Sequence, residues 1–556
     1  MAVFIHLMLS LTNLWSVLGV FPITVSGPIL YALHRGETTK AFENYLSQIN
    51  DGQPHDFTLL QQAGKALLEQ GMLSADSDIQ LMCMFGAGVA TSSDLLPVLE
   101  KGIKSADLRT QLVALSYLGK QQDDEADLIL LEALSSPFLI TRLEALLQLA
   151  KKNHPAVIGH LHSLTFKVPV VVRSVFAQIA IHLEGMEASH YLHRLLTDAD
   201  VNVRVETILT VAQEMRDDFL PCLRALASGP SYAQQEATAY AFGELKDSYS
   251  IGRLKDLATS KQETVRLAAA IALYELGDRG YLEPIEVLAR NGSLYAIASL
   301  GKLREGKETL STLLTHSERD VRLNAVLALL NHRDREALNY LEEILIDDGR
   351  DLGFWRITSA GGGLKAWRTL SSASQRSKGY PGLIGQTMGL REKIVSQCIE
   401  FEEQDFLKIA RLIFDKKQHA LVPLMTQLLQ NRKSKAVIQL LKEGYQKAGA
   451  PLIRNYCTLA LYRLKEDGPY EEQLISWVKA RGSEELIQFR EEEECLNFSD
   501  PHQLTPEETS RFLVESCEAL ASAQNRAGLE VLIHALAYGN PKNRYALAGL
   551  LLRTTE

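Results

Sequence analysis

A column of basic residues is the feature of this sequence best suited to binding chemistry. Its members stand 31 residues apart over four intervals, with one glutamine among them: Arg142, Arg173, Arg204, Gln235 and Arg266. Two further arginines open similar segments outside the strict spacing, at Arg109 and Arg322. Evenly spaced guanidinium groups could bind the phosphates of a nucleic acid or the carboxylates of an acidic peptide.

Metal binding and catalysis find less support in the residues. The histidines that could act as ligands are His160, His162, His190 and His193, but their spacing offers pairs where a metal site needs three or four ligands. The six cysteines form no CxxC pair. The sequence contains no GxSxG, HExxH or GxxxxGK[ST] motif. We therefore predict no catalytic, metal-binding or cofactor-binding residues and a protein that is not an enzyme.

The elements that carry the arginines form a repeat. Leucines recur at the same 31-residue step, at Leu130, Leu161, Leu192, Leu223 and Leu254. Between them, apolar residues recur every three or four positions, which is the spacing of one helix face. A fixed period of this length is the signature of a solenoid, in which each unit buries its apolar face against its neighbours. Such a chain presents long surfaces, and it is more suited to holding molecules than to transforming them.

A known family resembles these repeats. A turn with Asp198, Asp200 or Asp320, then Val203-Arg204 or Val321-Arg322, then an Ala/Leu-rich helix resembles HEAT repeats of the short kind also found in bilin lyases. The resemblance covers about residues 75–346 and returns near Arg454 and Arg544. It implies an all-α fold, a right-handed α-α superhelix.

In the resembling repeats, the arginine binds the turn aspartate and neighbouring carbonyl groups and joins one unit to the next. This implied structural lock, which we prefer to ligand binding, consists of Arg109, Arg142, Arg173, Arg204, Arg266 and Arg322. One enzyme subclass of HEAT proteins binds iron through repeated His-Glu dipeptides. This chain has no such dipeptide, so that activity is not implied.

The register breaks at residues 347–388, which we interpret as a flexible, Gly/Ser-rich basic insertion between two arms, 75–346 and 389–556. Residues 350–380 carry six basic residues against Asp351 alone. Two aromatic-basic pairs lie 12 positions apart, Trp355-Arg356 and Trp367-Arg368. Exposed Trp and Arg dominate binding hot spots, so these four are candidate partner-binding residues. The alternative is a linker whose tryptophans dock on the solenoid.

The N-terminus is apolar, and residues 2–33 contain no Asp, Glu, Lys or Arg. Residues 1–27 could be a cleaved secretory signal, a membrane anchor that leaves the repeats in the cytosol, or a buried cap. The protein would accordingly be exported or membrane-anchored. Residues 28–74 are predicted to form a helical cap, with two helices meeting at Gly36 and another ending near Gly71.

Composition narrows the function. The net charge of −10 disfavours a dedicated nucleic-acid binder and modestly favours basic partners. We expect a non-enzymatic scaffold that holds a protein or peptide, of unknown identity, on the solenoid surface. One alternative is lyase-type or chaperone-like handling of a cofactor, as in the bilin-lyase repeats. Another is weak nucleic-acid binding through the basic insertion.

Overall fold

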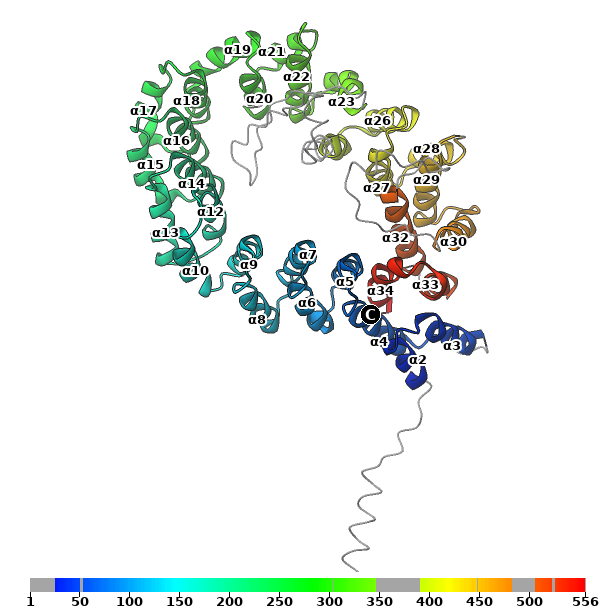
Figure 1. The fold of residues 1–556 in the computed structure, drawn as a ribbon. Helices are drawn as coiled ribbons and strands as arrows, with labels where there is room; N and C mark the ends of the chain where they lie inside the picture. Colours follow the sequence, from blue (N-terminus) through cyan, green and yellow to red (C-terminus); the bar gives the residue numbers. More distant parts are fainter. Residues whose placement is uncertain are drawn as a thin grey trace, which may run out of the picture. The chain divides into compact units, whose positions relative to one another are not determined.

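The computed structural model describes residues 26–50, 54–303, 305–346, 391–447, 449–482, 506–522 and 526–555. No β-strand occurs in these ranges, and the described chain is built from paired helices of a HEAT-like α-solenoid (Figure 1). It divides into two compact units. Unit 1 comprises residues 1–126, 468–489 and 506–556, and unit 2 comprises 127–467 and 490–505.

Unit 2 consists of short helices that alternate with longer ones. Its first helices are α8 (Asp124–Ala133, which begins in unit 1), α9 (Leu139–Lys151), α10 (Ala156–Thr165), α11 (Val170–Arg173), α12 (Val175–Ala180), α13 (Met186–Leu196), α14 (Val201–Gln213), α15 (Leu220–Leu226) and α16 (Tyr232–Glu244). The next are α17 (Ile251–Leu257), α18 (Glu263–Glu275), α19 (Leu282–Arg290), α20 (Leu294–Leu303), α21 (Lys307–Leu313), α22 (Arg319–Asn331) and α23 (Glu342–Leu345). The last are α26 (Glu403–Asp415), α27 (Val422–Arg432), α28 (Lys435–Tyr445) and α29 (Pro451–Arg463).

The predicted register is confirmed by burial. The leucine column on the short helices is inaccessible to solvent at every described step: Leu130, Leu161, Leu192, Leu223 and Leu254. On the longer helices, small and apolar residues one period apart are buried as well: Leu146, Ala177, Ile208, Ala239 and Ala270. Successive long helices such as α14, α16 and α18 therefore pack directly on one another. Each repeat completes its core only with its neighbours.

Unit 1 combines both ends of the chain. Its N-terminal helices are α2 (Ser26–His34), α3 (Thr38–Asn50), α4 (Phe57–Gly71), α5 (Ser77–Ala90), α6 (Leu96–Ile103) and α7 (Leu108–Leu118). Its C-terminal helices are α30 (Tyr470–Arg481), α32 (Pro506–Ser522), α33 (Arg526–Tyr538) and α34 (Pro541–Thr555). Helix α34 packs against α4 and α5, and α33 packs against α3. The first and last helices thus cover each other's apolar faces.

Glycines permit the close packing of α34 on the N-terminal helices. A Cβ atom on Gly549 would lie 2.0 Å from the carbonyl oxygen of Gly86, and one on Gly86 would lie 2.3 Å from that of Tyr545. Polar contacts join the same helices, since Gln61 Nε2 donates to the carbonyl of Thr555 at 2.8 Å. The prediction of two arms divided at 347–388 followed the register alone, whereas the compact units group residues 506–556 with the N-terminal cap.

The N-terminal expectations fall partly inside the described region. Helices α2 and α3 meet at Gly36, whose φ of +76° suits glycine, and α4 ends at Gly71, as predicted. Helix α2, the end of the apolar segment, packs on α3 and α4 with Ile29 and Leu33 buried. Membrane attachment through residues 26–33 is therefore not supported, while residues 1–25 lie outside the described part. Among the described residues, no helix is both long and apolar enough to span a membrane.

Candidate functional site

The arginine column forms hydrogen bonds at the turns between helices. Arg204 Nη1 donates to the carbonyl oxygens of Asp198 and Ala199, at 2.6 and 3.0 Å. Arg266 and Arg322 form the same two bonds six and five residues back, at 2.8–3.1 Å. Each arginine thus ties the start of its long helix to the preceding turn, as expected of a structural lock.

Several of these arginines also reach the next repeat. Arg173 Nη1 lies 2.8 Å from Asp198 Oδ2, and Arg204 Nε donates to Gln234 Oε1 at 2.7 Å. Arg322 Nη2 donates to Glu343 at 3.0 Å. In unit 1, Arg109 pairs with Asp78 and Asp107. Arg142 differs, because its Nε is buried and has no hydrogen-bond partner among the described residues.

A second column of ion pairs links the short helices to the following turn. Arg224 donates to both carboxylate oxygens of Asp247, at 2.8 and 2.6 Å, and Lys307 pairs with Asp334 at 2.6 Å. Burial of Asp247 acts to raise its pKa, but hydrogen bonds from Arg224 and Ser250 and the Arg224 charge lower that pKa overall. Sequence reasoning missed this column, although Asp247 and Asp278 stand 31 residues apart.

We expect Asp247→Asn to lower the free energy of unfolding by about 2 kcal/mol at pH 7, because a buried charge-assisted pair is lost. Since the pKa of Asp247 is lowered in the fold, its stabilisation is present above the ordinary value of 3.8 and is lost as pH falls through the native pKa. Urea unfolding at pH 7 and pH 3 measures both effects. Asp256→Asn, at a 73% exposed side chain, is the control and should change stability by less than about 0.5 kcal/mol.

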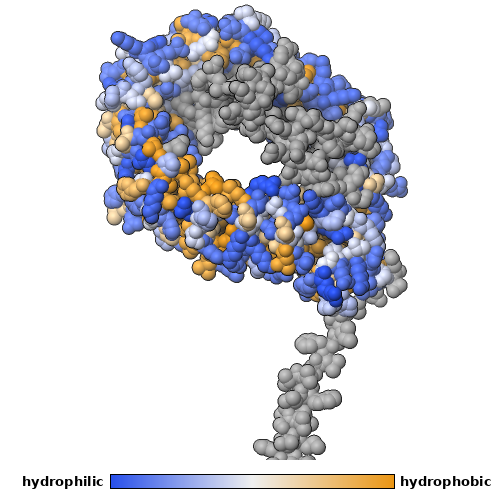
Figure 2. All heavy atoms as spheres, in the orientation of Figure 1, coloured by the Kyte–Doolittle hydropathy of each residue, from blue (hydrophilic) through white to orange (hydrophobic). Residues whose placement is uncertain are grey.

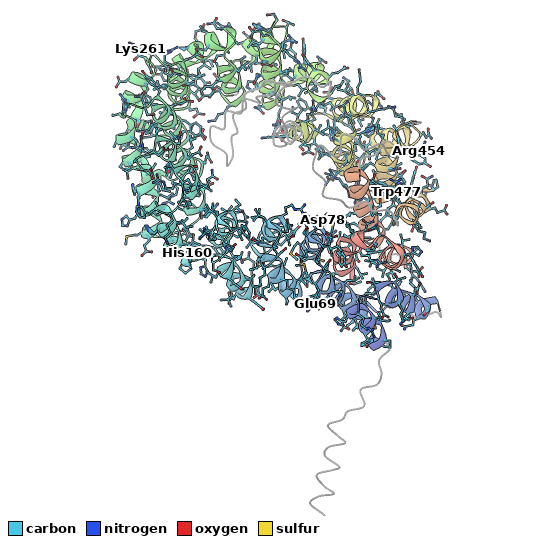
Figure 3. The ribbon with its side chains drawn as sticks, in the orientation of Figure 1. Glu69, Asp78, His160, Lys261, Arg454 and Trp477 are labelled. Carbon is cyan, nitrogen blue, oxygen red and sulfur yellow. The ribbon has the colours of Figure 1, made fainter. Side chains whose placement is uncertain are left out.

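The predicted hot-spot residues Trp355, Arg356, Trp367 and Arg368 lie outside the described residues. The four histidines are all exposed, including His160 on α10, labelled in Figure 3. His162 contacts the ring of Tyr191 edge-on, at 4.9 Å between centroids, and accepts or donates a bond with Arg194 at 3.3 Å. Within the described ranges, no group of three potential ligands is placed to hold a metal ion.

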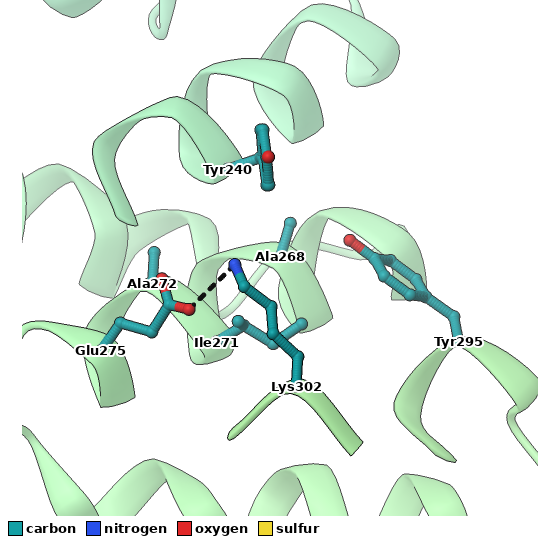
Figure 4. Close-up of a pocket in the computed structure, with 7 residues that line it drawn as sticks. All are labelled: Tyr240, Ala268, Ile271, Ala272, Glu275, Tyr295 and Lys302. Atoms are coloured by element: carbon teal, nitrogen blue, oxygen red, sulfur yellow. Dashed lines mark ion pairs between the residues drawn. The ribbon is translucent and has the colours of Figure 1, made fainter. Parts of the chain in front are cut away.

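A hollow in unit 2 brings together residues of three consecutive repeats (Figure 4). Its empty space is about 290 Å³, including the part open to solvent. It is lined by Tyr240 from α16, by Ala268, Ile271, Ala272 and Glu275 from α18, and by Tyr295 and Lys302 from α20. Tyr240, Ile271 and Lys302 stand 31 residues apart, so the repeat itself aligns them. The sequence contained this signal, but only packing shows that these positions share one cavity.

Lys302 carries the charge of this hollow. Its ammonium nitrogen lies 3.0 Å from Glu275 Oε1, pairs with Glu244, and lies 5.4 Å from the centroid of the Tyr240 ring. Burial acts to lower the pKa of Lys302, but the two carboxylates outweigh it and raise the pKa above 10.5. The amine is therefore protonated at neutral pH, which is opposite to what a nucleophilic or Schiff-base lysine needs.

The other titratable groups of the hollow are also held away from catalysis. Burial, with nearby carboxylates, raises the pKa of Tyr240 and of Tyr295, so both phenols stay neutral hydrogen-bonding groups. Burial likewise raises the pKa of Glu236, against a hydrogen bond from Thr264 that lowers it. An apolar floor, two aromatic walls and one charge cluster suit the binding of a side chain.

The described cysteines do not supply a nucleophile either. Burial raises the pKa of Cys398 and of Cys517 to about 12, and it also raises the pKa of Cys83, Cys222 and Cys457. A thiol that stays protonated is a poor nucleophile and a poor metal ligand. These residues act as small apolar side chains of the helical core.

No protein-family model matches the chain, and no curated protein sequence matches it significantly. Solved structures are similar at low identity. The CpcE–CpcF complex of phycocyanin lyase from Nostoc sp. PCC7120 is 18% identical over 44% of this chain and 91% of that chain, with a TM-score of 0.26. Yeast importin-beta (Kap95p) is 11% identical over 93% and 65%, with a TM-score of 0.30. Kap121p bound to Pho4p is 12% identical over 91% and 74%, with a TM-score of 0.32. At these values the likenesses bear on neither the activity nor the partners of this chain.

Proposed function

We propose that the protein is a non-enzymatic scaffold that holds a protein or peptide partner on its solenoid surface. The observation that carries the proposal is the hollow formed by α16, α18 and α20. It combines aromatic walls with a fixed ion cluster, and its lysine is protonated and bound by carboxylates. Its volume of about 290 Å³ lies at the lower limit of pockets for small ligands and suits one inserted side chain.

Site-specific photo-crosslinking tests this function. A benzophenone-bearing amino acid in place of Tyr240, in the full-length protein in its native cell, should capture a defined protein partner identifiable by mass spectrometry. The same substitution at Tyr249, which is 87% exposed in unit 2 outside the hollow, is the matched control and should not capture that protein. Adducts with a small molecule or a nucleic acid at Tyr240, or identical protein adducts at both positions, would contradict the proposal.

A further inference from the structure

One repeat of unit 2 lacks the bonds that its neighbours share. In the described chain, Arg142 on α9 forms no hydrogen bond or ion pair, and its Nε is buried without a partner. Arg173, Arg204, Arg266 and Arg322, at equivalent positions, all donate to carbonyl or carboxylate oxygens. An arginine left without partners costs stability rather than adding it, so its retention here needs another explanation.

The repeat register explains why Arg142 has no partner. Asp198 accepts from Arg173 across 25 positions, but the residue 25 positions after Arg142 is Lys167. Gln234 accepts from Arg204 across 30 positions, but the residue 30 positions after Arg142 is Val172. A cation and an alkyl group thus replace the two acceptors. The charge of Arg142 is therefore available to a ligand.

Exposed apolar side chains surround this position along the chain. Phe138 and Ile140, at the start of α9, are 44% and 47% exposed, and Val170, at the start of α11, is 41% exposed. Phe166, at the end of α10, is 80% exposed, and the guanidinium of Arg194 lies 4.5 Å from the centroid of its ring. Figure 2 shows hydrophobic residues gathered on this part of unit 2. Exposed apolar groups concentrated in one place mark interaction surfaces.

The charge of the same stretch is opposite to that of the whole chain. Residues 135–175 contain five basic residues, whereas Glu144 is their single carboxylate. The Glu144 carboxylate accepts a hydrogen bond from Gln148 at 2.6 Å. The chain as a whole has a net charge of −10. A basic, apolar surface on an acidic protein favours a ligand that is acidic and apolar.

We propose that a surface of unit 2, here named the Arg142 surface, binds an acidic, apolar peptide segment of a protein partner. It consists of Phe138, Ile140, Arg142, Phe166, Lys167 and Val170. Carboxylates of the segment pair with Arg142 and Lys167, and its bulky side chains cover the exposed phenylalanines. This inference rests on the proposed scaffold function but uses a different surface. Phosphate-backbone binding is disfavoured, because four of the six residues are apolar.

Fluorescence anisotropy with the full-length protein tests the proposal. The probe is a labelled peptide of alternating leucine and glutamate, compared with leucine–lysine and serine–glutamate peptides and with a single-stranded oligonucleotide. We expect the leucine–glutamate peptide to bind best. Arg142→Gln should weaken it about tenfold, the usual effect of losing one charged contact at an interface, and Phe166→Ser should also weaken it. Met215→Ser, at a 59% exposed side chain of unit 2, is the control and should leave the affinity unchanged.

Stability measurements separate binding from folding. Since Arg142 has no bond to lose, Arg142→Gln should leave the melting temperature unchanged, whereas Arg204→Gln should lower it. The proposal is overturned if the leucine–lysine peptide or the oligonucleotide binds as well as the acidic peptide, or if Arg142→Gln binds the probe like the wild type. Absence of peptide binding together with partner capture at Tyr240 would reject this surface and leave the scaffold function standing.

Discussion

Gly549→Ala is expected to lower the free energy of unfolding of unit 1 by about 2–3 kcal/mol, the usual cost of overpacking a close helix contact. The added Cβ would lie 2.0 Å from the carbonyl oxygen and 2.6 Å from the carbonyl carbon of Gly86. Both are backbone atoms, so relief requires α34 to move away from α5. That movement would expose the buried residues Leu547 and Leu551 of α34.

The matched control is the same substitution at Gly159 on α10. A Cβ there would meet no atom within 4 Å, and alanine is favoured over glycine inside a helix by about 1 kcal/mol. Gly159→Ala should therefore be neutral or stabilising. Chemical denaturation gives the change in stability, and hydrogen exchange should show faster exchange in α5 and α34 of Gly549→Ala. Equal stability of the two variants would show that α34 does not depend on this close approach.

Lys302→Met is expected to lower the free energy of unfolding of unit 2 by about 3 kcal/mol at pH 7, because it leaves two partly buried carboxylates without their shared cation. The side chains of Glu244 and Glu275 are 23% and 12% exposed. The deficit should shrink as pH falls toward 4, because protonation removes the repulsion between the carboxylates. Denaturation curves between pH 4 and pH 8 measure this dependence.

The wild-type protein should behave in the opposite way at high pH. Because the pKa of Lys302 is raised in the fold, the stabilisation from the ion cluster is present below 10.5 and is lost as pH rises through the native pKa. Adding Glu275→Gln to Lys302→Met should restore part of the stability, since one uncompensated charge is removed. Lys255→Met, at a 55% exposed lysine 3.8 Å from Asp278, is the control. A deficit that grows as pH falls would refute the electrostatic explanation.

The sequence predicted most of the fold because the repeat is local. Leu192 and Leu223 are buried for the same reason in successive repeats, and their 31-residue step is visible without any structure. The arginine column was equally visible, yet its members are not equivalent. Arg204 finds carbonyl and amide acceptors, while Arg142 finds none, because Lys167 and Val172 stand where acceptors stand in the neighbouring repeats.

The candidate site was harder to predict. Lys302, Glu275 and Glu244 each resemble ordinary surface residues of a helix in the sequence. Their ion pairs arise because the 31-residue step places one residue of each of three repeats on the same face. Sequence reasoning placed the candidate partner-binding residues at Trp355 and Trp367 instead, and these stay predictions because they lie outside the described residues.

The sequence by itself determined the helix pairs, their register and their buried columns, because each of these depends on contacts between residues within about one repeat of each other. Only the tertiary structure decided that α34 packs on α4 and α5, where Gln61 meets Thr555 across 494 positions. That contact depends on geometry summed over the whole array, and no local pattern of residues contains it. Both ends of the chain are apolar for one physical reason, since each covers the exposed face of the other.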